Sequence, residues 1–350
     1  MIHDIDFETA LNLDKIQFVD LRSPVEFCEA SIPGAINLPL LDDDERVEVG
    51  TIYRHFGPVQ ARSKGLEFVG PRLAALIKEV QILACDYNVV LYCWRGGNRS
   101  QSLARVLDIM DINGYRLQGG FKAYRRYVVN KLESVPNGSV VVLHGLTGTG
   151  KTNILKELNR LGMPAIDLEG LANHRGSVFG GIGLSDQPRQ KQFESILLDE
   201  ILETHRHGYL IVESESRKIG RLFLPDRLYS MMQSGVHVLV YDSIENRVNR
   251  ILSEYLGDSK ISSQDLKEIM KTLVKFIGKK RLQEYFDMMD NENYQGLIRS
   301  LLLEYYDPLY GYASGPDSDF ELSLNGSSTH EASKILANWL QNKMRGGSVA

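Results

Sequence analysis

Residues 145–152, Gly-Leu-Thr-Gly-Thr-Gly-Lys-Thr, match the pattern G-x-x-x-x-G-K-[ST] without deviation, and no other feature constrains the fold as strongly. The apolar run 139–144 precedes this motif, and the helical pattern of residues 151–162 follows it. In such a unit the glycines let successive backbone N–H groups converge on phosphate oxygens at a helix N-terminus, where the dipole favours an anion. The motif therefore predicts a parallel α/β sheet with a phosphate-binding loop, or P-loop, after one strand.

The chemistry of the P-loop gives several side chains a role. Lys151 would reach the outer phosphates, and the Thr152 hydroxyl could ligate Mg²⁺. Glu213 and Glu215, at the end of one predicted strand, could assist a metal ion, with Asp167 at the end of the preceding strand as an alternative. All three fit equally well as solvated acids, so the sequence leaves the metal open. The residues expected to contact phosphate are Gly145, Thr147, Gly148, Thr149, Gly150, Lys151 and Thr152.

A glycine-rich segment, Asn173 to Ser185, separates the second strand of this half from the next helical pattern. Such a loop can approach a ligand closely, although a plain surface loop would have the same composition. If it faces the P-loop, it is placed to hold the non-phosphate part of a substrate. The side chains expected to do so are His174, Arg175, Ser177 and Phe179.

The N-terminal half shows its own alternation of apolar runs and helical patterns. A strand is expected over residues 16–21, and Ser23, Pro24 and Glu26 then form a helix-start pattern with a capping box. Strands that alternate with helices in this way indicate a parallel sheet with helices on both faces.

A domain boundary is expected at Leu132 to Ser139, which supplies Pro, Asn, Gly and Ser in succession. We therefore predict a first domain over residues 1–133 and a P-loop domain over residues 134–350. From about residue 244 the second domain is expected to continue as a helical extension.

The segment from Cys93 to Arg99 follows the predicted strand NVVLY and precedes a helical pattern. A cysteine at the end of a parallel strand lies where open α/β sheets bind ligands. The loop N–H groups, the helix N-terminus and an arginine would favour a thiolate and would also hold a tetrahedral oxyanion. Cys93 is therefore the candidate nucleophile, against the alternative of a small core residue. The oxyanion loop comprises Trp94, Arg95, Gly96, Gly97, Asn98 and Arg99.

Composition limits the class of protein. Hydrophobic residues make up 43% and charged residues 24% of the 350 residues, as in ordinary globular proteins. Three cysteines indicate a reducing, cytoplasmic setting, and Cys28 and Cys85 lack the surroundings of Cys93 and are expected to be inert. No apolar stretch approaches about 18 residues and the N-terminus is acidic, so we expect neither a membrane span nor a signal peptide.

The N-terminal half resembles the rhodanese superfamily of sulfurtransferases. The matching segments FVDLRSPVEF, ASIPGAINLP, YCWRGGNRSQSLA and LQGGFKAY occur in order across residues 16–124. Rhodaneses carry sulfur on the loop cysteine, and Cys93 takes that position. With five residues between Cys93 and Arg99, the loop is one residue longer than in many sulfurtransferases and resembles that of dual-specificity phosphatases and arsenate reductases. This resemblance implies room for a larger oxyanion, such as a phosphate ester or selenophosphate.

Together, the segments CWRGGNRS, HGLTGTGKT, DLEGLANHRGS and VESESRKIG make the chain similar to the bacterial tRNA 2-selenouridine synthases. This resemblance implies that selenium from selenophosphate replaces the sulfur of 2-thiouridine at the wobble position of tRNA. It also implies an S-geranylated intermediate made from geranyl diphosphate, with Val178, Phe179 and Ile182 as candidates for contact with the tail. The residues alone leave open whether the P-loop binds geranyl diphosphate or ATP, because backbone N–H groups bind phosphate and not adenine.

The partners implied by this resemblance are tRNA, through an anticodon loop with 2-thiouridine, and an enzyme that supplies selenophosphate. The net charge of −5 argues that any tRNA contact comes from local basic faces, each of which could equally be an ordinary solvated surface. We expect the most regular of these faces on one continuous helix over residues 271–281. The candidate residues are Lys271, Lys275 and Lys279 on that helix, with Arg125 and Arg126 elsewhere.

The predicted fold class is α/β, with a rhodanese-like parallel-sheet domain followed by a P-loop NTPase-like α/β domain that has a helical C-terminal part. The runner-up function is a rhodanese-superfamily phosphatase or arsenate reductase with a P-loop regulatory domain. It would use Cys93 and Arg99, but it needs a general acid that the sequence does not place. A tRNA-binding or signalling module with an inactive rhodanese domain is a third class, and the presence of Cys93 argues against it.

Overall fold

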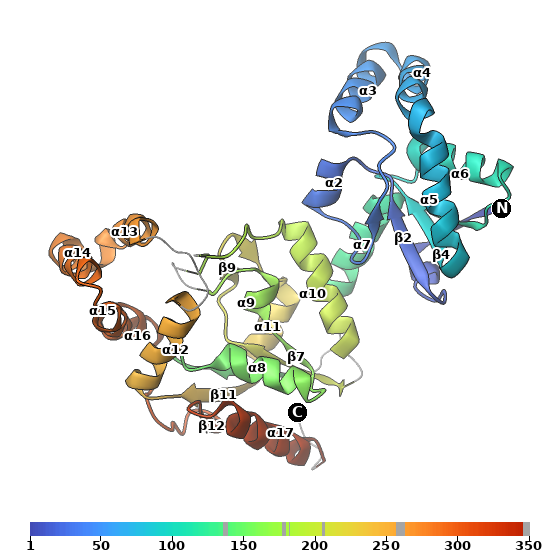
Figure 1. Ribbon diagram of the computed structural model, residues 1–350. Helices are drawn as coiled ribbons and strands as arrows, with labels where there is room; N and C mark the ends of the chain where they lie inside the picture. Colours follow the sequence, from blue (N-terminus) through green and yellow to red (C-terminus); the bar gives the residue numbers. More distant parts are fainter. Residues whose placement is uncertain (136–138, 177–179, 182, 205–206, 257–262, 346–350) are drawn as a thin grey trace. The chain divides into compact units, whose positions relative to one another are not determined.

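The computed structural model describes the chain except for residues 136–138, 177–179, 182, 205–206, 257–262 and 346–350 (Figure 1). It forms two compact units, one of Met1–Glu133 with Pro188–Leu198 and one of Ser134–Gln187 with Asp199–Ala350. Each unit is built on a five-stranded parallel sheet. The predicted fold class is therefore confirmed. None of the helices in the described part of the chain is both long and apolar enough to cross a membrane.

The sheet of unit 1 has the strand order β1-β5-β4-β2-β3. Its centre, β4, pairs with β2 in register from Ile16 opposite Asn88 to Asp20 opposite Tyr92. Helices cover the apolar strands, and Val19, Leu91 and Leu103 are fully buried between them. The strands are β1 (Ile2–Ile5), β2 (Ile16–Asp20), β3 (Ile36–Asn37), β4 (Asn88–Tyr92) and β5 (Gly114–Leu117).

The helices of unit 1 include one that forms as predicted and two that the sequence did not reveal. Helix α2 (Pro24–Glu29) starts with a capping box between Ser23 and Glu26, as expected. Helices α3 and α4 were not predicted, because charged residues fill α3 and Ala61 is the one buried side chain of the pair. The helices are α1 (Phe7–Ala10), α2, α3 (Asp43–Phe56), α4 (Pro58–Val69), η1 (Gly70–Arg72), α5 (Leu73–Asp86), α6 (Asn98–Ile109) and α7 (Gly120–Glu133).

The sheet of unit 2 has the order β12-β11-β6-β8-β7, and β6 lies at the point where the order of the strands reverses. Ligands of open α/β sheets bind at the carboxyl end of the strands at such a point. Figure 1 shows α8 and α17 side by side along this sheet, where Ile154, Leu158 and Leu336 are fully buried in one core. The strands are β6 (Ser139–His144), β7 (Ala165–Ile166), β8 (Tyr209–Glu213), β11 (Val236–Tyr241) and β12 (Leu322–Asn325), with a separate hairpin of β9 (Lys218–Ile219) and β10 (Leu222–Phe223).

The helices of unit 2 surround this sheet and then continue into a helical part with its own apolar core, which includes Met270, Tyr285 and Leu302. The edge strand β12 was not expected, because the polar segment around it hides a four-residue strand that pairs with β11. The helices are α8 (Lys151–Arg160), α9 (Leu168–Leu171), α10 (Gln190–Thr204), α11 (Asp226–Gln233), α12 (Ile244–Leu256), α13 (Ser263–Thr272), α14 (Val274–Asp290), α15 (Tyr294–Leu301), the π-helix η3 (Leu302–Tyr306), α16 (Asp307–Tyr310) and α17 (Thr329–Arg345).

The predicted continuous helix over residues 271–281 is wrong. Lys271 lies near the end of α13, Leu273 is the N-cap of α14, and Gly278 has φ 79° and ψ 163°, which breaks the helix inside α14. Since this left-handed backbone is accessible chiefly to glycine, the four-residue spacing of Lys271, Lys275 and Lys279 does not produce one helical face. Lys271 is in addition paired with Glu268.

Candidate functional site

The P-loop of unit 2 has the strand–loop–helix geometry that its motif predicts. Strand β6 ends at His144, and α8 begins at Lys151 with Gly150 as a left-handed cap at φ 92°. Glycine is required at position 145 as well, because its φ is 149° and a Cβ there would lie 2.2 Å from the Val240 carbonyl oxygen. The loop thus presents backbone N–H groups at the N-terminus of α8, the arrangement that binds phosphate.

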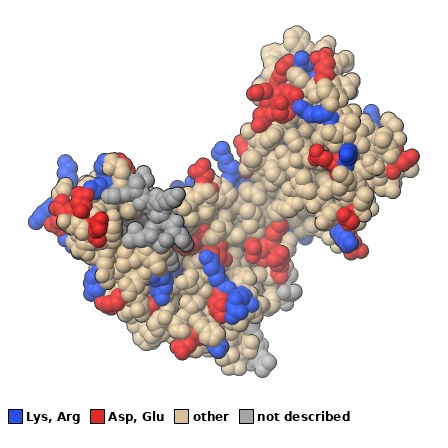
Figure 2. All heavy atoms as spheres, viewed as in Figure 1, with Lys and Arg blue, Asp and Glu red and all other residues tan. Residues whose placement is uncertain are grey.

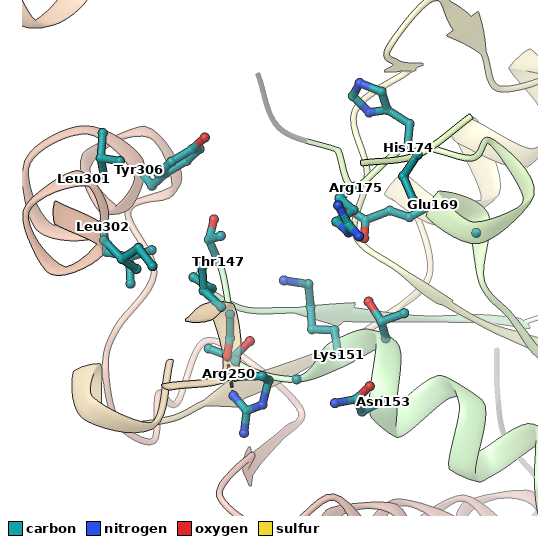
Figure 3. Close-up of a pocket in the computed structure, with 18 of the residues that line it drawn as sticks. Thr147, Lys151, Asn153, Glu169, His174, Arg175, Arg250, Leu301, Leu302 and Tyr306 are labelled. Atoms are coloured by element: carbon teal, nitrogen blue, oxygen red, sulfur yellow. Dashed lines mark hydrogen bonds between the residues drawn. The ribbon is translucent and has the colours of Figure 1, made fainter. Parts of the chain in front are cut away.

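Lys151 lies over this loop, and its ammonium donates a hydrogen bond of 2.8 Å to the Gly145 carbonyl. Burial lowers the pKa of Lys151, while the neighbouring carboxylates of Glu169 and Glu215 act in the opposite direction. Figure 3 shows the side chain reaching into the space between Leu301, Leu302 and Tyr306 on one side and Glu169, His174 and Arg175 on the other. A phosphate group bound by the loop would compete with this carbonyl for the ammonium.

Two arginines of α12 hold the P-loop, and sequence reasoning missed both. Arg247 is buried, donates 2.8 Å from Nε to the Thr147 carbonyl and pairs with Asp307. Arg250 donates to the Gly148 carbonyl and, at 3.0 Å, to Asp242. The only sequence signal was that the two arginines lie three residues apart on a helix that follows a strand. Such spacing is common on helices and does not by itself indicate a site.

A cavity of about 480 Å³ opens beside the P-loop within unit 2. One part of its lining is polar and contains the P-loop, Lys156, Arg175 and Glu215. The other part is apolar and comes from α12, α13, α15 and η3, and Tyr294 and Tyr310 also line the cavity. The apolar lining residues on these helices are Ile251, Leu266, Met270, Leu297, Ile298, Leu301, Leu302 and Tyr306.

Two of the predicted acidic partners, Glu213 and Asp167, differ in their surroundings. Glu213 is buried at the end of β8, accepts a 2.7 Å hydrogen bond from the Glu169 N–H, and its Oε2 has no partner among the described residues. Burial and the charge of Asp167 raise the pKa of Glu213 well above its usual range. Asp167 caps α9 by accepting from the Gly170 N–H at 2.7 Å and lines the cavity.

Glu215, the third predicted acid, lines the cavity, whereas Glu213 does not. Burial, together with the charge of Glu169, raises the pKa of Glu215 to about 8. The carboxylates of Glu169 and Glu215 both lie beside Gly176, where an added Cβ would clash with their oxygens. Glu169 and Glu215 therefore form a carboxyl pair near Lys151. Because two adjacent negative charges repel, the pair favours the state in which one of the two carboxyls is protonated. In the described part of the chain, no three His, Cys, Asp or Glu side chains are arranged to hold a metal ion.

Part of the predicted substrate loop contributes to the same cavity. His174 and Arg175 line it, as expected, whereas Ser177 and Phe179 lie outside the described residues, as do Val178 and Ile182. The Nδ1 of His174 is buried and lacks a partner among the described residues, and burial lowers the pKa of His174. Its imidazole is therefore neutral near pH 7.

In unit 1, Cys93 lies at the end of β4 and is 3% exposed. Its Sγ is 3.3 Å from the Ser100 Oγ and 3.9 Å from the Gly97 carbonyl oxygen. The loop is held against α7, because the Phe121 N–H donates 2.8 Å to the Cys93 carbonyl and the Lys122 N–H donates 3.0 Å to the Trp94 carbonyl.

The loop closes tightly around Gly96, which has φ 65°, and a Cβ there would lie 2.8 Å from the Leu117 carbonyl oxygen. Helix α6 then starts at Asn98, with Gly97 as its cap. The N-terminus of α6 thus faces the loop that holds Cys93, as predicted for an oxyanion site.

The two arginines of this loop differ. Arg95 is exposed, whereas Arg99 pairs with Glu26 at 2.5 Å. Although burial acts in the opposite direction, the Arg99 guanidinium holds the pKa of Glu26 below its usual value. An oxyanion that recruits Arg99 must therefore share it with Glu26. Cys28 and Cys85 are exposed and free.

The remaining predicted basic residues of unit 1 also differ. Arg125 pairs with Glu194 and donates 3.0 Å to the Ser195 Oγ, so its charge is already compensated. Arg126 is exposed on α7.

Family models match both units. A model of the tRNA 2-selenouridine synthase AAA domain matches residues 138–344, and a model of the rhodanese-like domain matches residues 6–127. The chain belongs to the tRNA 2-selenouridine synthase family. The P-loop lies within the range matched by the AAA-domain model, and the Cys93 loop lies within the range matched by the rhodanese-like model.

Relatives named tRNA 2-selenouridine synthase match over nearly their full length. The one from Pseudomonas syringae pv. syringae (strain B728a) is 37% identical, covering 87% of this chain and 90% of the relative. The one from Pseudomonas putida (strain W619) is 35% identical, covering 91% and 94%. The one from Sulfurovum sp. (strain NBC37-1) is 34% identical, covering 88% and 91%. The likeness therefore extends across both units.

Proposed function

We propose that this chain is an enzyme that converts wobble 2-thiouridine of tRNA to 2-selenouridine, through an S-geranylated intermediate made from geranyl diphosphate. Family membership supports tRNA modification as the activity. The observation that carries the geranyl step is the cavity of about 480 Å³, which joins a phosphate-binding loop to an apolar wall.

The polar end of the cavity suits a diphosphate. The N–H groups of the P-loop and the N-terminus of α8 bind phosphate oxygens, and Lys151 supplies a cation. Arg250 holds the Gly148 carbonyl and so fixes the loop. Mg²⁺ would be bound by the Thr152 hydroxyl together with diphosphate oxygens, since the described residues form no three-ligand site.

The apolar end suits a prenyl chain better than a nucleoside. Its lining includes Ile251, Leu266, Met270 and Ile298, which offer contact to a hydrocarbon and no hydrogen bonds to ribose hydroxyls. Burial of a hydrocarbon gains about 0.8 kcal/mol per CH₂. A nucleotide would expose its polar base and sugar to this wall, so geranyl diphosphate fits the cavity better than ATP does.

In the transfer step, the thione sulfur of 2-thiouridine attacks C1 of the geranyl group. The C1–O bond breaks, diphosphate leaves with the electron pair, and the base loses its N3 proton. The protein binds and orients both substrates, and the P-loop and Lys151 stabilise the charge that develops on the diphosphate. The alkylated sulfur can then leave as a neutral thiol after protonation, whereas sulfide is a poor leaving group.

Cys93 is proposed to release selenium from selenophosphate. Selenium in this compound already has the oxidation level of selenide, so no oxidant is needed if the Cys93 Sγ attacks phosphorus. The P–Se bond breaks, and hydrogen selenide leaves to attack C2 of the geranylated base. The geranyl-bearing sulfur takes a proton from water, and the C2–S bond breaks to release geranylthiol. Water later cleaves the S–P bond. The α6 N-terminus and Arg99 would stabilise the transferred phosphoryl group.

A phosphatase or arsenate reductase remains the alternative for unit 1. It needs an acid near the nucleophile. Among the described residues, the hydrogen-bond partners of the Cys93 Sγ are Ser100 and the Gly97 carbonyl, neither of which is acidic. A reduced Cys93 is common to both alternatives and fits a cytoplasmic location.

The test is mass spectrometry of tRNA nucleosides after incubation of 2-thiouridine tRNA with the protein. Geranyl diphosphate alone should yield S-geranyl-2-thiouridine, and further addition of selenophosphate should yield 2-selenouridine. Hydrolysis of ATP without any change of the nucleosides would overturn the proposal. Intact-protein mass after selenophosphate alone should show a phosphoryl group added to Cys93.

A further inference from the structure

The segment between α13 and the break in α14 places an exposed aromatic ring among lysines. Val274 and Ile277 pack against the helical core, and this anchors the segment. Phe276 lies between them in sequence and is 70% exposed. Lys275, Lys279 and Lys280 are also exposed, and with Phe276 these residues form what we call the Phe276 surface.

The lysines of the Phe276 surface carry uncompensated charge. In the part of the chain that the structure describes, none of the three ammonium groups of Lys275, Lys279 and Lys280 has an ion-pair partner. The acids nearby are engaged by other cations. The pairs are Lys271 with Glu268, Lys267 with Asp290, and Arg281 with both Glu284 and Glu304.

The ring of Phe276 is held on one side only. It contacts Tyr305 at 5.8 Å between ring centroids, and its remaining surface is open. Figure 2 shows charged side chains of both signs over the region of α13 and α14. An isolated exposed phenylalanine is ordinary, but one that stands among unpaired lysines on an anchored segment has the composition of a single-strand nucleic-acid contact.

This surface lies close to the cavity. Tyr305 contacts Tyr306 at 5.0 Å between ring centroids, and Tyr306 lines the cavity next to the P-loop. Phe276 is therefore two ring contacts away from the site where the base would react. A nucleotide neighbouring the modified base can span such a distance, since successive backbone units of a single strand extend several ångströms.

We propose that the Phe276 surface binds the single-stranded anticodon loop of the RNA substrate, with a base stacked on Phe276 and phosphates bound by Lys275, Lys279 and Lys280. This rests on the proposed function, because the RNA is the substrate of the neighbouring cavity. The charge favours RNA over a protein partner: three unpaired cations match a phosphate backbone, and stacking on an aromatic ring does not depend on base identity. Gly278 shapes the surface by turning the chain between Phe276 and Lys279.

The test uses the full chain and a fluorescent anticodon stem-loop RNA that contains 2-thiouridine. Phe276→Ala and Phe276→Leu should weaken RNA binding by roughly 5- to 150-fold, the equivalent of the ~1–3 kcal/mol that a stacked base contributes. Phe276→Tyr keeps an aromatic ring and should bind the RNA with close to wild-type affinity. A matched control, Phe223→Ala, removes another exposed aromatic of unit 2 beside a lysine and should leave RNA binding unchanged.

The lysines are tested through salt dependence. Lys275→Gln with Lys279→Gln should lower the slope of log affinity against log salt by about 1.4, since each phosphate contact of a single strand contributes about 0.7. The control pair Lys78→Gln with Lys334→Gln removes the same charge from exposed sites on α5 and α17 and should change the slope little.

The outcomes separate this inference from the proposed function. If the wild-type chain geranylates the RNA but Phe276→Ala and the lysine variants bind it with wild-type affinity and slope, the inference is wrong and the proposed function stands. If the wild type neither binds nor modifies the RNA, both fall. A change in self-association without a change in RNA binding would assign Phe276 to a protein contact and overturn the inference.

Discussion

The Cys93 loop of unit 1 and the P-loop of unit 2 both follow a central parallel strand and both lead into a helix N-terminus. They differ in what surrounds the anion site. Around Cys93 the loop is closed by Gly96, and Arg99 is already shared with Glu26. Beside Lys151 the P-loop opens into a cavity of about 480 Å³ with an apolar wall.

The comparison shows that the same strand–loop–helix arrangement is placed in two different surroundings. In the proposed function, the Cys93 loop supplies the reactive atom that releases selenium from selenophosphate. In the same proposal, the P-loop supplies no nucleophile and instead positions geranyl diphosphate, whose reacting carbon would lie next to the bound diphosphate. We therefore expect variants of the two loops to affect different steps.

The largest effect is expected from Cys93→Ser. Serine keeps the size of the side chain but is a far weaker nucleophile, so formation of 2-selenouridine should fall by at least about 1,000-fold. Geranylation should remain within about 3-fold of wild type, because the P-loop cavity lies wholly in unit 2. Nucleoside mass spectrometry measures both products.

The matched controls for this variant are Cys28→Ser and Cys85→Ser, which change exposed cysteines of the same unit. Both should be close to wild type in both steps. Near-normal 2-selenouridine formation by Cys93→Ser would contradict the role assigned to the loop, and a parallel loss of geranylation would erase the contrast between the two loops.

The second effect is expected from Lys151→Ala. Loss of a charged contact worth about 1.5–3 kcal/mol should weaken diphosphate binding by roughly 10- to 150-fold. Geranylation should decrease accordingly, while selenation of tRNA that already carries S-geranyl-2-thiouridine should be retained. Titration with geranyl diphosphate and with inorganic diphosphate measures the loss.

Lys156→Ala is the control for Lys151→Ala, because Lys156 lines the same cavity with a side chain that is 68% exposed. It should weaken binding by no more than about 5-fold, as expected for an exposed charge. Equal loss of geranylation and selenation in Lys151→Ala would instead indicate that the P-loop serves the whole cycle.

These two sites show what the sequence can and cannot predict. Both loops are contiguous, so eight residues around Lys151 and seven around Cys93 contain the information, and both form as predicted. The apolar wall brings together residues such as Ile251, Leu266 and Ile298 from separate helices. Each of them belongs to an ordinary amphipathic pattern, so the sequence could not show that they share a cavity.

The error over Lys271, Lys275 and Lys279 has a similar physical origin. Four-residue spacing predicts a shared face only where the backbone remains helical, and Gly278 permits a left-handed conformation that interrupts it. Conversely, Arg247 was missed because its partners, Thr147 and Asp307, are distant in the sequence. Local patterns predicted the central strands and the two loops, whereas the contacts that hold and complete the site depend on tertiary packing.

The third prediction tests the apolar wall of the P-loop cavity. Ile298→Ala removes carbons from the part-buried lining, and at about 0.8 kcal/mol per CH₂ it should weaken geranyl diphosphate binding by up to roughly 50-fold. Affinity for inorganic diphosphate, measured by calorimetry, should stay the same. If both ligands lose affinity equally, the wall does not contact the prenyl chain. Ile335→Ala, at an exposed position of α17, is the control.

The smallest effect concerns the carboxylates, whose pKa values shift in opposite directions at the two sites. Arg99 lowers the pKa of Glu26 despite its burial, whereas burial and Glu169 raise the pKa of Glu215 to about 8. The folded state binds the proton of Glu215 more tightly than the unfolded state does. The contribution of this proton to the free energy of unfolding is therefore complete below pH 4.5, the ordinary pKa, and is lost as the pH rises through about 8. The melting temperature of the wild type should therefore fall between pH 6 and pH 9.

Glu215→Gln cannot ionise, so its melting temperature should fall less over this range, by a few degrees, since ~1 kcal/mol corresponds to about 2–4 °C. Glu157→Gln is the control: the pKa of Glu157 is lowered to about 2, so its charge does not change between pH 6 and pH 9.

The proton of Glu215 should also affect ligand binding, because ionised Glu215 would repel a diphosphate beside Lys151. Affinity for geranyl diphosphate should decrease as the pH rises through about 8 in the wild type and less so in Glu215→Gln. An identical pH profile for the two proteins would show that the carboxyl pair does not face the diphosphate, and the contrast with Glu26 would then concern stability alone.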